Sequence, residues 1–510
     1  MTGVFACLCD RAFASKSAAA GLKKLAGAGY AEVVKDLCSA AGRAAVTARI
    51  REQGIDRAVL AGCPALDRAG AAAAAAAEAG IPAPHVAFLP IAAGSDAASA
   101  APSMRRVLAA LEAMPGFETR RWKLAQTVLV IGAGPAGREA ARAIAGLGHG
   151  VTMIERSASI PPDAAMAGVE VLPSTTLERF EGFPGAFIAR LRGPGGVEER
   201  TFGAAVVATG LELADPAREP FVPGSVVPLD VLSAHLAGLR IRQLPKSLAI
   251  VLDLEIDEGK ASCQAAYRAA VEALTAYRAN VTLLVRDAKV AAPELNQEYD
   301  DAREAGIAVL KFTGRPAVRP AGTGGGGATI EARDSVTGAG TAVVADLVAI
   351  SRWGLGSPAD ARLAAALGLD LDALARFQDN SSRLVPVATN RAGVFVAGAC
   401  RGETWMPAVI REARVAALAA HALLAPRAAT VDTAHAVVDP DRCALCLTCV
   451  RSCPFSAMGI DAADRSAACR TESCRRCGIC AGECPNKAIT LPAWSDPIVM
   501  ALAGAAEGRP

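Results

Sequence analysis

Eight cysteines near the end of this sequence fall into two runs with identical spacing. Each run reads Cys-x2-Cys-x2-Cys-x3-Cys-Pro. Three thiolates separated by two residues wrap a loop around one face of an iron–sulfur cube, whereas the fourth, on a proline-led segment, reaches the other cube. The spacing therefore predicts two 4Fe–4S clusters that exchange their fourth ligand, with the ligand sets Cys443, Cys446, Cys449 and Cys484, and Cys474, Cys477, Cys480 and Cys453.

Two such runs are typical of a two-cluster bacterial ferredoxin, and zinc or disulfides are the alternatives. A zinc site needs four ligands and has no use for an exchanged fourth cysteine. Disulfides would imply export, and Met1–Cys9 has neither the basic start nor the long apolar core of a signal peptide. Cys469 lies outside both runs and is interpreted as a free thiol.

A glycine-rich turn indicates a second kind of chemistry. The apolar strand predicted at Thr127–Ile131 leads into the turn GAGPAG, a helix from Arg138 to Leu147 and a second strand, Val151–Ile154. In a βαβ dinucleotide unit these glycines allow a tight turn, close approach of the pyrophosphate and close helix packing, and the acid after the second strand binds ribose. The candidate cofactor-binding residues are Gly132, Gly134, Pro135, Ala136, Gly137, Glu155 and Arg156.

Two later stretches favour FAD over NAD. Ala204–Gly210 and Gly393–Gly398 resemble recurring strands of two-dinucleotide-binding flavoproteins of the thioredoxin-reductase type. In that family the second stretch leads into a helix whose N-terminus faces the flavin, expected here from about Pro407 to Leu424. The family's usual Asp is replaced by Ala399-Cys400, so ribityl contacts must come from elsewhere. The resemblance adds the candidates Thr209, Gly210, Gly398, Ala399, Met406 and Pro407.

A second αβ unit is predicted between these stretches, at about 245–350. In the thioredoxin-reductase pattern this unit binds the nicotinamide cofactor through its own glycine loop. Here the loop at 253–259 reads DLEIDEG, and its acidic side chains would repel a pyrophosphate. We therefore expect that NAD(P)H does not bind there and that electrons reach the flavin by another route.

Four further cysteines lie near the N-terminus, and strands predicted at Thr2–Cys9 and Arg57–Gly62 end at or just before cysteines. Alternating strands and helices predict a small α/β domain with its thiols at one sheet edge. These thiols either ligate a third cluster or are unrelated buried cysteines, which pack well as small hydrophobes. The residues concerned are Cys7, Cys9, Cys38 and Cys63.

The composition fits a chain of two to four α/β domains, because 510 residues can form several cores. The formal charge is +2 with neutral cysteines, and each oxidised cluster would subtract about two charges. No basic patch argues for nucleic acid, and no window of eighteen strongly apolar residues predicts a membrane span. Fifteen cysteines without export predict reduced thiols and metal in the cytoplasm.

The sequence resembles the heterodisulfide reductase A-subunit family, including its bacterial members. The likeness lies in GVFACLCD, LCSAAG and LAGCP near the N-terminus, the glycine turn, DEGKASCQAAYRAAVEAL, the stretch 384–424 and the ferredoxin runs. In that family the N-terminal cysteines hold an additional 4Fe–4S cluster. The resemblance implies a cytoplasmic electron-transfer subunit whose partners are a ferredoxin, hydrogenase or dehydrogenase donor and a disulfide-reducing or quinone-binding subunit. Homodimerisation is compatible with it, and any membrane contact would be made through partner subunits.

Three departures from the family bear on how electrons would flow. The ferredoxin inserted in long members is missing, since no cysteine lies between Glu155 and Thr209. A lysine usually placed near the flavin aligns with Thr404, and a cysteine pair of the middle helix is reduced to Cys263. These departures leave electron bifurcation undecided.

The resulting prediction is an α/β flavoprotein of the thioredoxin-reductase type with an α+β ferredoxin domain. We place an N-terminal α/β domain at 1–118, the FAD-binding domain at 119–428, a two-cluster ferredoxin domain at 436–491 and a tail at 492–510. The predicted function is FAD- and 4Fe–4S-based electron transfer within a heterodisulfide-reductase-like complex. The alternatives are a stand-alone NAD(P)H-dependent reductase of the glutamate synthase small-subunit type and a scaffold stabilised by clusters. No catalytic acid, base or nucleophile is assigned.

Overall fold

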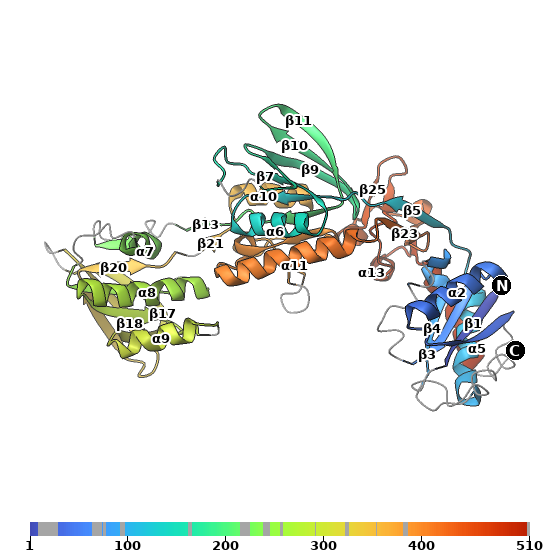
Figure 1. Cartoon of the computed structure of the whole chain (residues 1–510), viewed down its shortest axis with the longest axis horizontal. Coiled ribbons are helices and arrows are strands. Elements are labelled where there is room, and N and C mark those ends of the chain that lie inside the picture. The colour runs from blue at the N-terminus through green and yellow to red at the C-terminus, as the bar shows by residue number, and fades with distance from the viewer. Residues whose placement is uncertain are drawn as a thin grey trace. The chain divides into compact units, whose positions relative to one another are not determined.

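The computed structural model describes residues 1–8, 29–63, 74, 78–91, 97–161, 166–214, 225–237, 245–254, 259–290, 292–321, 326–352, 354–380 and 386–506. The chain divides into two compact units. Met1–Leu124 and Pro426–Pro510 together form the first unit, and Ala125–Ala425 forms the second (Figure 1). The first unit therefore combines both ends of the chain.

A four-stranded parallel sheet of order β2-β1-β3-β4 is the centre of the N-terminal part. Side chains alternate along β1, so that Val4 packs on the face covered by α5 and Phe5 on the face covered by α2. Both faces are thus buried, as expected for a parallel sheet. The elements are β1 Thr2–Leu8, β2 Tyr30–Lys35, α2 Ala40–Gln53, β3 Arg57–Gly62, β4 Val86–Pro90 and α5 Ala97–Ala113.

The remainder of the first unit contains the cysteine runs. Strand β5 (Thr119–Lys123) pairs antiparallel with β23 (Ala428–Asp432), and helix α14 (Asp496–Ala506) packs on α5. The packing of α14 on α5 joins the tail to the N-terminal domain, which the sequence prediction treated as separate. The two cysteine runs lie among β24 Val437–Val438, α12 Thr448–Ser452, β25 Met458–Asp461, β26 Ser466–Cys469, α13 Ile479–Glu483 and β27 Ile489–Thr490.

The second unit begins with a five-stranded parallel sheet of order β22-β12-β6-β7-β8. Helices α6 and α11 pack against each other, and Leu129 of β6 packs with an antiparallel sheet, β9-β10-β11, and with α10. The elements are β6 Thr127–Ile131, α6 Pro135–Gly146, β7 Gly150–Ile154, β8 Val169–Leu172, β9 Thr176–Phe183, β10 Ala186–Gly193, β11 Gly196–Phe202, β12 Ala204–Val207, α10 Pro358–Leu367, β22 Val394–Val396 and α11 Met406–Leu424.

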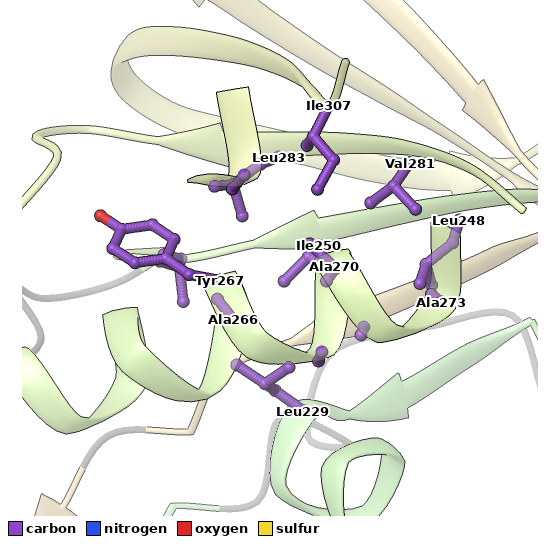
Figure 2. Packing of buried hydrophobic residues seen from close by; sticks show 14 of the residues in the cluster. Leu229, Leu248, Ile250, Ala266, Tyr267, Ala270, Ala273, Val281, Leu283 and Ile307 are labelled. Carbon is purple, nitrogen blue, oxygen red and sulfur yellow. The ribbon is translucent and has the colours of Figure 1, made fainter. Parts of the chain in front are cut away.

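A seven-stranded sheet of order β14-β20-β15-β16-β17-β18-β19 forms the middle of the second unit. Tyr267 of α8 and Leu283 of β16 meet in its core (Figure 2). The elements are β14 Val226–Pro228, α7 Leu229–Ala237, β15 Ser247–Val251, α8 Lys260–Tyr277, β16 Asn280–Val285, α9 Leu295–Glu304, β17 Ala308–Pro320, β18 Ala328–Asp334, β19 Gly340–Ala345 and β20 Leu347–Ile350, with the short pair β13 Glu212–Leu213 and β21 Gly354–Leu355.

These sheets confirm the predicted α/β class with two αβ units. Helix α11 begins at Met406 and ends at Leu424, close to the predicted bounds. Helix α6 begins at Pro135, three residues before the predicted start, because proline is well suited to a first helical turn. Among the described residues, no helix is both long and apolar enough to span a bilayer.

Candidate flavin and iron–sulfur sites

The glycine turn after β6 fits tightly against neighbouring backbone. Gly132 has a φ of +108°, and a Cβ there would overlap the carbonyl oxygen of Ala208. A Cβ at Gly137 would overlap the carbonyl oxygen of Gly132, whereas one at Gly134 would meet nothing within 4 Å. The fold itself thus requires the first and third glycines. The space beside Gly134 is open at the N-terminus of α6, where a pyrophosphate would bind.

Glu155 stands directly after β7 and faces this turn. Its carboxylate accepts hydrogen bonds from the backbone N–H of Ala133 at 2.8 Å and of Ser157 at 2.9 Å. A cavity of about 500 Å³ opens beside it. The predicted residues Gly132, Glu155, Arg156 and Thr209 line this cavity, and so do residues that the sequence did not indicate: Thr175, Thr176, Leu177, Asp360 and Arg362.

Asp360 is the buried acid among the lining residues that sequence reasoning missed. It accepts a hydrogen bond from the Thr209 hydroxyl at 2.7 Å and forms a capping box with Ser357 at the start of α10. The Ser-x-x-Asp spacing could have predicted this helix start from the sequence. Only the fold brings the capping acid to the cavity, because the carboxylate lies far along the chain from the glycine turn.

The second flavoprotein stretch contacts the start of α6. Gly398 follows β22 with a φ of +77°, and a Cβ there would lie 2.8 Å from the Cβ of Ala136. Its N–H donates to a carboxylate oxygen of Glu412 at 2.9 Å. The structure places the predicted residues of this region next to α6 or at the start of α11. None of them lines the 500 Å³ cavity; they are Gly398, Ala399, Met406 and Pro407. Gly210 follows β12 with a φ of +82°.

Cys400 is a buried packing residue. Its thiol lies 3.4 Å from the carbonyl oxygens of Val207 and Ala397. Burial raises the pKa of the Cys400 thiol to about 12, which keeps it protonated at neutral pH. Cys263 is likewise buried, in the core of the middle sheet, and burial raises the pKa of its thiol. Neither thiol has the character of a reactive thiolate.

Cations gather around Trp405 just before α11. The Lys260 ammonium lies 5.7 Å from the centre of the indole ring and the Arg411 guanidinium 5.4 Å from it. Lys260 is the first residue of α8, and a Cβ at Gly259 would lie 3.4 Å from the Thr404 hydroxyl. Lys260 thus places a positive charge next to Trp405, although the position aligned with the family lysine is Thr404. Nothing in the sequence indicated this contact, which joins residues distant along the chain.

The turn after β15 differs from the turn after β6 in length and polarity. Three residues connect β6 to α6, whereas the connection from β15 to α8 runs from Leu252 to Gly259. Arg286 stands after β16, at the position that Glu155 occupies after β7, and donates to the Asp253 carbonyl at 3.1 Å. The buried Asp253 carboxylate lies 3.4 Å from the Lys289 ammonium. Residues 255–258 of the acidic loop lie outside the described part of the chain.

The eight cysteines of the two runs surround two separate spaces. The first space is lined by Cys443, Cys446, Cys449 and Cys484. The second space is lined by Cys453, Cys474, Cys477 and Cys480, together with Cys469. The structure therefore brings the fourth cysteine of each run to the thiols of the other run. In the described residues, no three His, Cys, Asp or Glu side chains converge on the position of a single metal ion.

Backbone N–H groups point at several of these sulfurs. The donors are Ala467 to Cys443 at 3.4 Å, Ala457 to Cys453 at 3.3 Å, Arg476 to Cys474 at 3.4 Å and Ala488 to Cys484 at 3.3 Å. Hydrogen bonds of this kind stabilise negative charge on cluster sulfurs and tune reduction potentials. The donor set and the thiol grouping both fit iron–sulfur clusters.

The N-terminal cysteines are placed differently. Cys7 packs with α2 on one face of the sheet, and Cys63 packs with α5 on the other face. Cys38 is exposed just beyond β2. All three lie at or beyond the carboxyl ends of neighbouring parallel strands, but Cys7 and Cys63 belong to opposite layers. Cys9 lies outside the described residues, and the third cluster stays a prediction.

Comparison with known proteins supports a flavin- and iron–sulfur-containing oxidoreductase. Residues 127–184 match the family described as pyridine nucleotide-disulphide oxidoreductase. Residues 435–458 match a 4Fe-4S binding domain, which covers the four cysteines of the first run. The matches fall on the glycine turn and on the first cysteine run.

Curated relatives confirm the predicted resemblance to the heterodisulfide reductase A-subunit family. A protein of Archaeoglobus profundus, itself similar to the A subunit of heterodisulfide reductase, is 31% identical over 125 residues, 24% of this chain and 18% of that protein. The iron–sulfur A subunit of CoB–CoM heterodisulfide reductase from Methanocaldococcus jannaschii is 29% identical over 162 residues, 32% of this chain and 25% of that protein. The matched stretches thus span a quarter or less of these two relatives.

A solved structure of thioredoxin reductase from T. acidophilum is similar over 58% of this chain and 98% of its own, at 16% identity and a TM-score of 0.40. The fold class rests on the sheet order of the second unit and on the family match, not on this partial superposition.

Proposed function

We propose that this chain is an electron-transfer subunit of a heterodisulfide-reductase-like complex, with FAD in the second unit and two 4Fe–4S clusters in the first. Bound flavin would exchange electron pairs, and bound clusters would exchange single electrons. The chain's own residues hold these groups: the Gly134 backbone and Glu155 around the dinucleotide, and four thiols around each cluster. Partner subunits supply the donor and the terminal acceptor.

The observation that carries the proposal is the grouping of the thiols. Each run gives three cysteines to one space and its fourth to the other, which is the arrangement of a two-cluster electron-transfer module. A two-cluster module in the same chain as a dinucleotide-binding site can convert two-electron transfer into one-electron transfer. A purely structural role for the clusters would not need the cradle.

The exchanged ligands can be tested with paired serine variants of the anaerobically purified chain. We expect Cys484→Ser to remove one cluster, and adding Cys446→Ser to cause no further loss, because both residues serve the first space. Cys484→Ser combined with Cys477→Ser should remove both clusters. Iron content and the EPR signal of the dithionite-reduced protein report the outcome. The reverse pattern between the two double variants would contradict the exchange.

The iron-to-flavin ratio tests the whole assignment. Two clusters with one FAD give about eight irons per flavin, and a third cluster at Cys7, Cys9, Cys38 and Cys63 would raise the ratio to about twelve. Zinc in place of iron would exclude the proposal. A Cys38→Ser variant that keeps the wild-type ratio would exclude a cluster that depends on this N-terminal thiol.

The stand-alone NAD(P)H-dependent reductase is disfavoured by the turn after β15. The connection from β15 to α8 is longer than the three-residue turn after β6, and its acidic side chains would repel a pyrophosphate. This geometry is consistent with electrons supplied by partner subunits.

A further inference from the structure

A cavity of about 470 Å³ lies within the first unit, beside the second cysteine run. Most of its lining is apolar and comes from β4 and α5 of the N-terminal part and from the short helix Pro492–Trp494 and α14 of the tail. Arg475 and Arg476 line both this cavity and the second thiol space, so they separate the two. Apolar walls with a few polar groups, in a volume of this size, are typical of small-molecule sites.

The two arginines are a difference between otherwise equivalent loops. The residues between the first two cysteines are Ala444 and Leu445 in the first run and Arg475 and Arg476 in the second. Leu445 and Arg476 both have a positive φ, +50° and +56°, so the two loops share this backbone feature. The loop conformation therefore does not require arginine at either position.

One of the two arginines is explained by a contact within the unit. Arg476 donates from Nη1 to both carboxylate oxygens of the buried Asp432, at 2.8 and 2.7 Å. Arg475 is exposed, and within the described part of the chain no residue forms a hydrogen bond or an ion pair with its guanidinium. The charge of Arg475 is therefore available to an anion in the cavity.

The other lining groups define what kind of anion fits. Trp494 lines the cavity and is 66% exposed, so an aromatic ligand would remove a large apolar surface from water. The described lining residues include no Asp, Glu, His, Lys, Tyr or Cys, the side chains that exchange protons most readily. The cavity is thus suited to binding a ligand rather than to acid–base chemistry on it.

We propose that this cavity binds a small aromatic monocarboxylate, with the carboxylate on Arg475 and the ring against Trp494 and the apolar wall. A planar guanidinium can form two parallel hydrogen bonds with a carboxylate, which gives both affinity and orientation. The inference goes beyond the proposed function, because it requires no electron transfer to or from the ligand. Since Arg475 directly follows Cys474, the bound carboxylate would neutralise a charge next to the second run.

Calorimetry with 2-naphthoate tests the site in the full chain, purified anaerobically and saturated with FAD. We expect one naphthoate to bind per chain and the neutral analogue 2-naphthamide to bind about tenfold more weakly, because it lacks the charge. Arg475→Gln should weaken naphthoate about tenfold and leave naphthamide unchanged. Arg465→Gln, which removes an exposed arginine from the turn between β25 and β26, is the matched control and should change neither affinity.

A second variant tests the position of the ligand. Ala110 of α5 lines the cavity, and Ala110→Leu should fill part of it and weaken both ligands. Thermal melting checks that each variant is folded; the exposed Arg475 is the substitution least able to disturb the fold.

Three results would overturn the inference: no saturable naphthoate binding, equal affinities for the two ligands, or wild-type naphthoate affinity in Arg475→Gln. Wild-type affinity in a folded Ala110→Leu variant would place the ligand elsewhere and would also overturn it. A wild-type chain without iron would instead contradict the proposed function.

Discussion

At the scale of single residues, the three glycines of the turn after β6 have separable roles. Gly132 and Gly137 are required by contacts within the fold, whereas Gly134 borders open space. The motif predicts a tight turn, close approach of the pyrophosphate and close helix packing for these three glycines. The structure separates a requirement for folding from a requirement for binding.

This separation predicts different results for three alanine variants. Gly134→Ala should fold with wild-type stability and retain much less FAD, because the added methyl group occupies the space of the pyrophosphate. Gly137→Ala should lower the free energy of unfolding by about 1–3 kcal/mol through overpacking against Gly132. Gly146→Ala in the same helix meets nothing within 4 Å and is the control. Flavin absorbance and thermal melting measure both effects, and a destabilised Gly134→Ala variant would contradict the assignment.

The structure also defines the role of Cys400. It belongs to the pair Ala399-Cys400, which directly follows the second flavoprotein stretch where the family usually has a ribityl-binding Asp. Because burial raises the pKa of its thiol to about 12, it cannot act as a thiolate nucleophile near pH 7. Packing against the carbonyls of Val207 and Ala397 accounts for its presence.

At the scale of elements, α14 links the C-terminal tail to the N-terminal domain. Ile498 is 2% exposed and Met500 is 68% exposed on the same helix, which packs on α5. The helix therefore presents one apolar side to the unit and leaves a second apolar side open.

We expect Ile498→Ala to lower the free energy of unfolding by about 2–4 kcal/mol, because it removes a buried side chain. Met500→Ala should change this free energy by less than about 0.5 kcal/mol, since the residue is on the surface. Chemical denaturation followed by circular dichroism measures both. Equal effects of the two substitutions would show that α14 does not pack on α5 in solution.

The turn between β15 and α8 gives a prediction about electron supply. Because a long connection with acidic side chains replaces a short glycine turn between β15 and α8, neither NADH nor NADPH should bleach the flavin of the isolated chain. Dithionite should bleach it fully. Flavin absorbance in anaerobic titrations measures both reactions, and rapid bleaching by either nucleotide would restore the stand-alone reductase as the function.

At the scale of the whole molecule, the chain is organised as a continuous central unit between two terminal segments that form the other unit. The pairing of β5 with β23 joins these segments directly before and after the central unit. The sequence prediction divided the same residues linearly into an N-terminal domain, a ferredoxin domain and a tail. Composition along a chain cannot show that its two ends pack together.

This organisation predicts that residues 125–425 fold alone. The fragment should bind FAD in a ratio near one and contain no iron, because every proposed cluster ligand lies in the other unit. Absorbance spectroscopy, iron analysis and thermal melting of the purified fragment test this expectation. Failure to fold would show that the first unit contributes to the stability of the flavin domain.

The sequence by itself predicted the chemistry that depends on local spacing. The two cysteine runs, the glycine turn after β6 and the start of α11 all involve residues within a few positions of one another, so that their geometry follows from the backbone between them. The same holds for the acidic residues that replace glycine after β15. The family resemblance, which the comparisons confirm, was carried by these short stretches.

Only the tertiary structure decided which distant residues meet. It brought Asp360 to the cavity beside Glu155, Lys260 to Trp405 and Cys469 to the second set of thiols. It also placed Cys7 and Cys63 in opposite layers of one sheet, although both follow the same strand-to-cysteine pattern. The physical reason is that burial and packing are shared by segments far apart in the chain. A local pattern specifies the groups available for chemistry, and the fold selects the groups that act together.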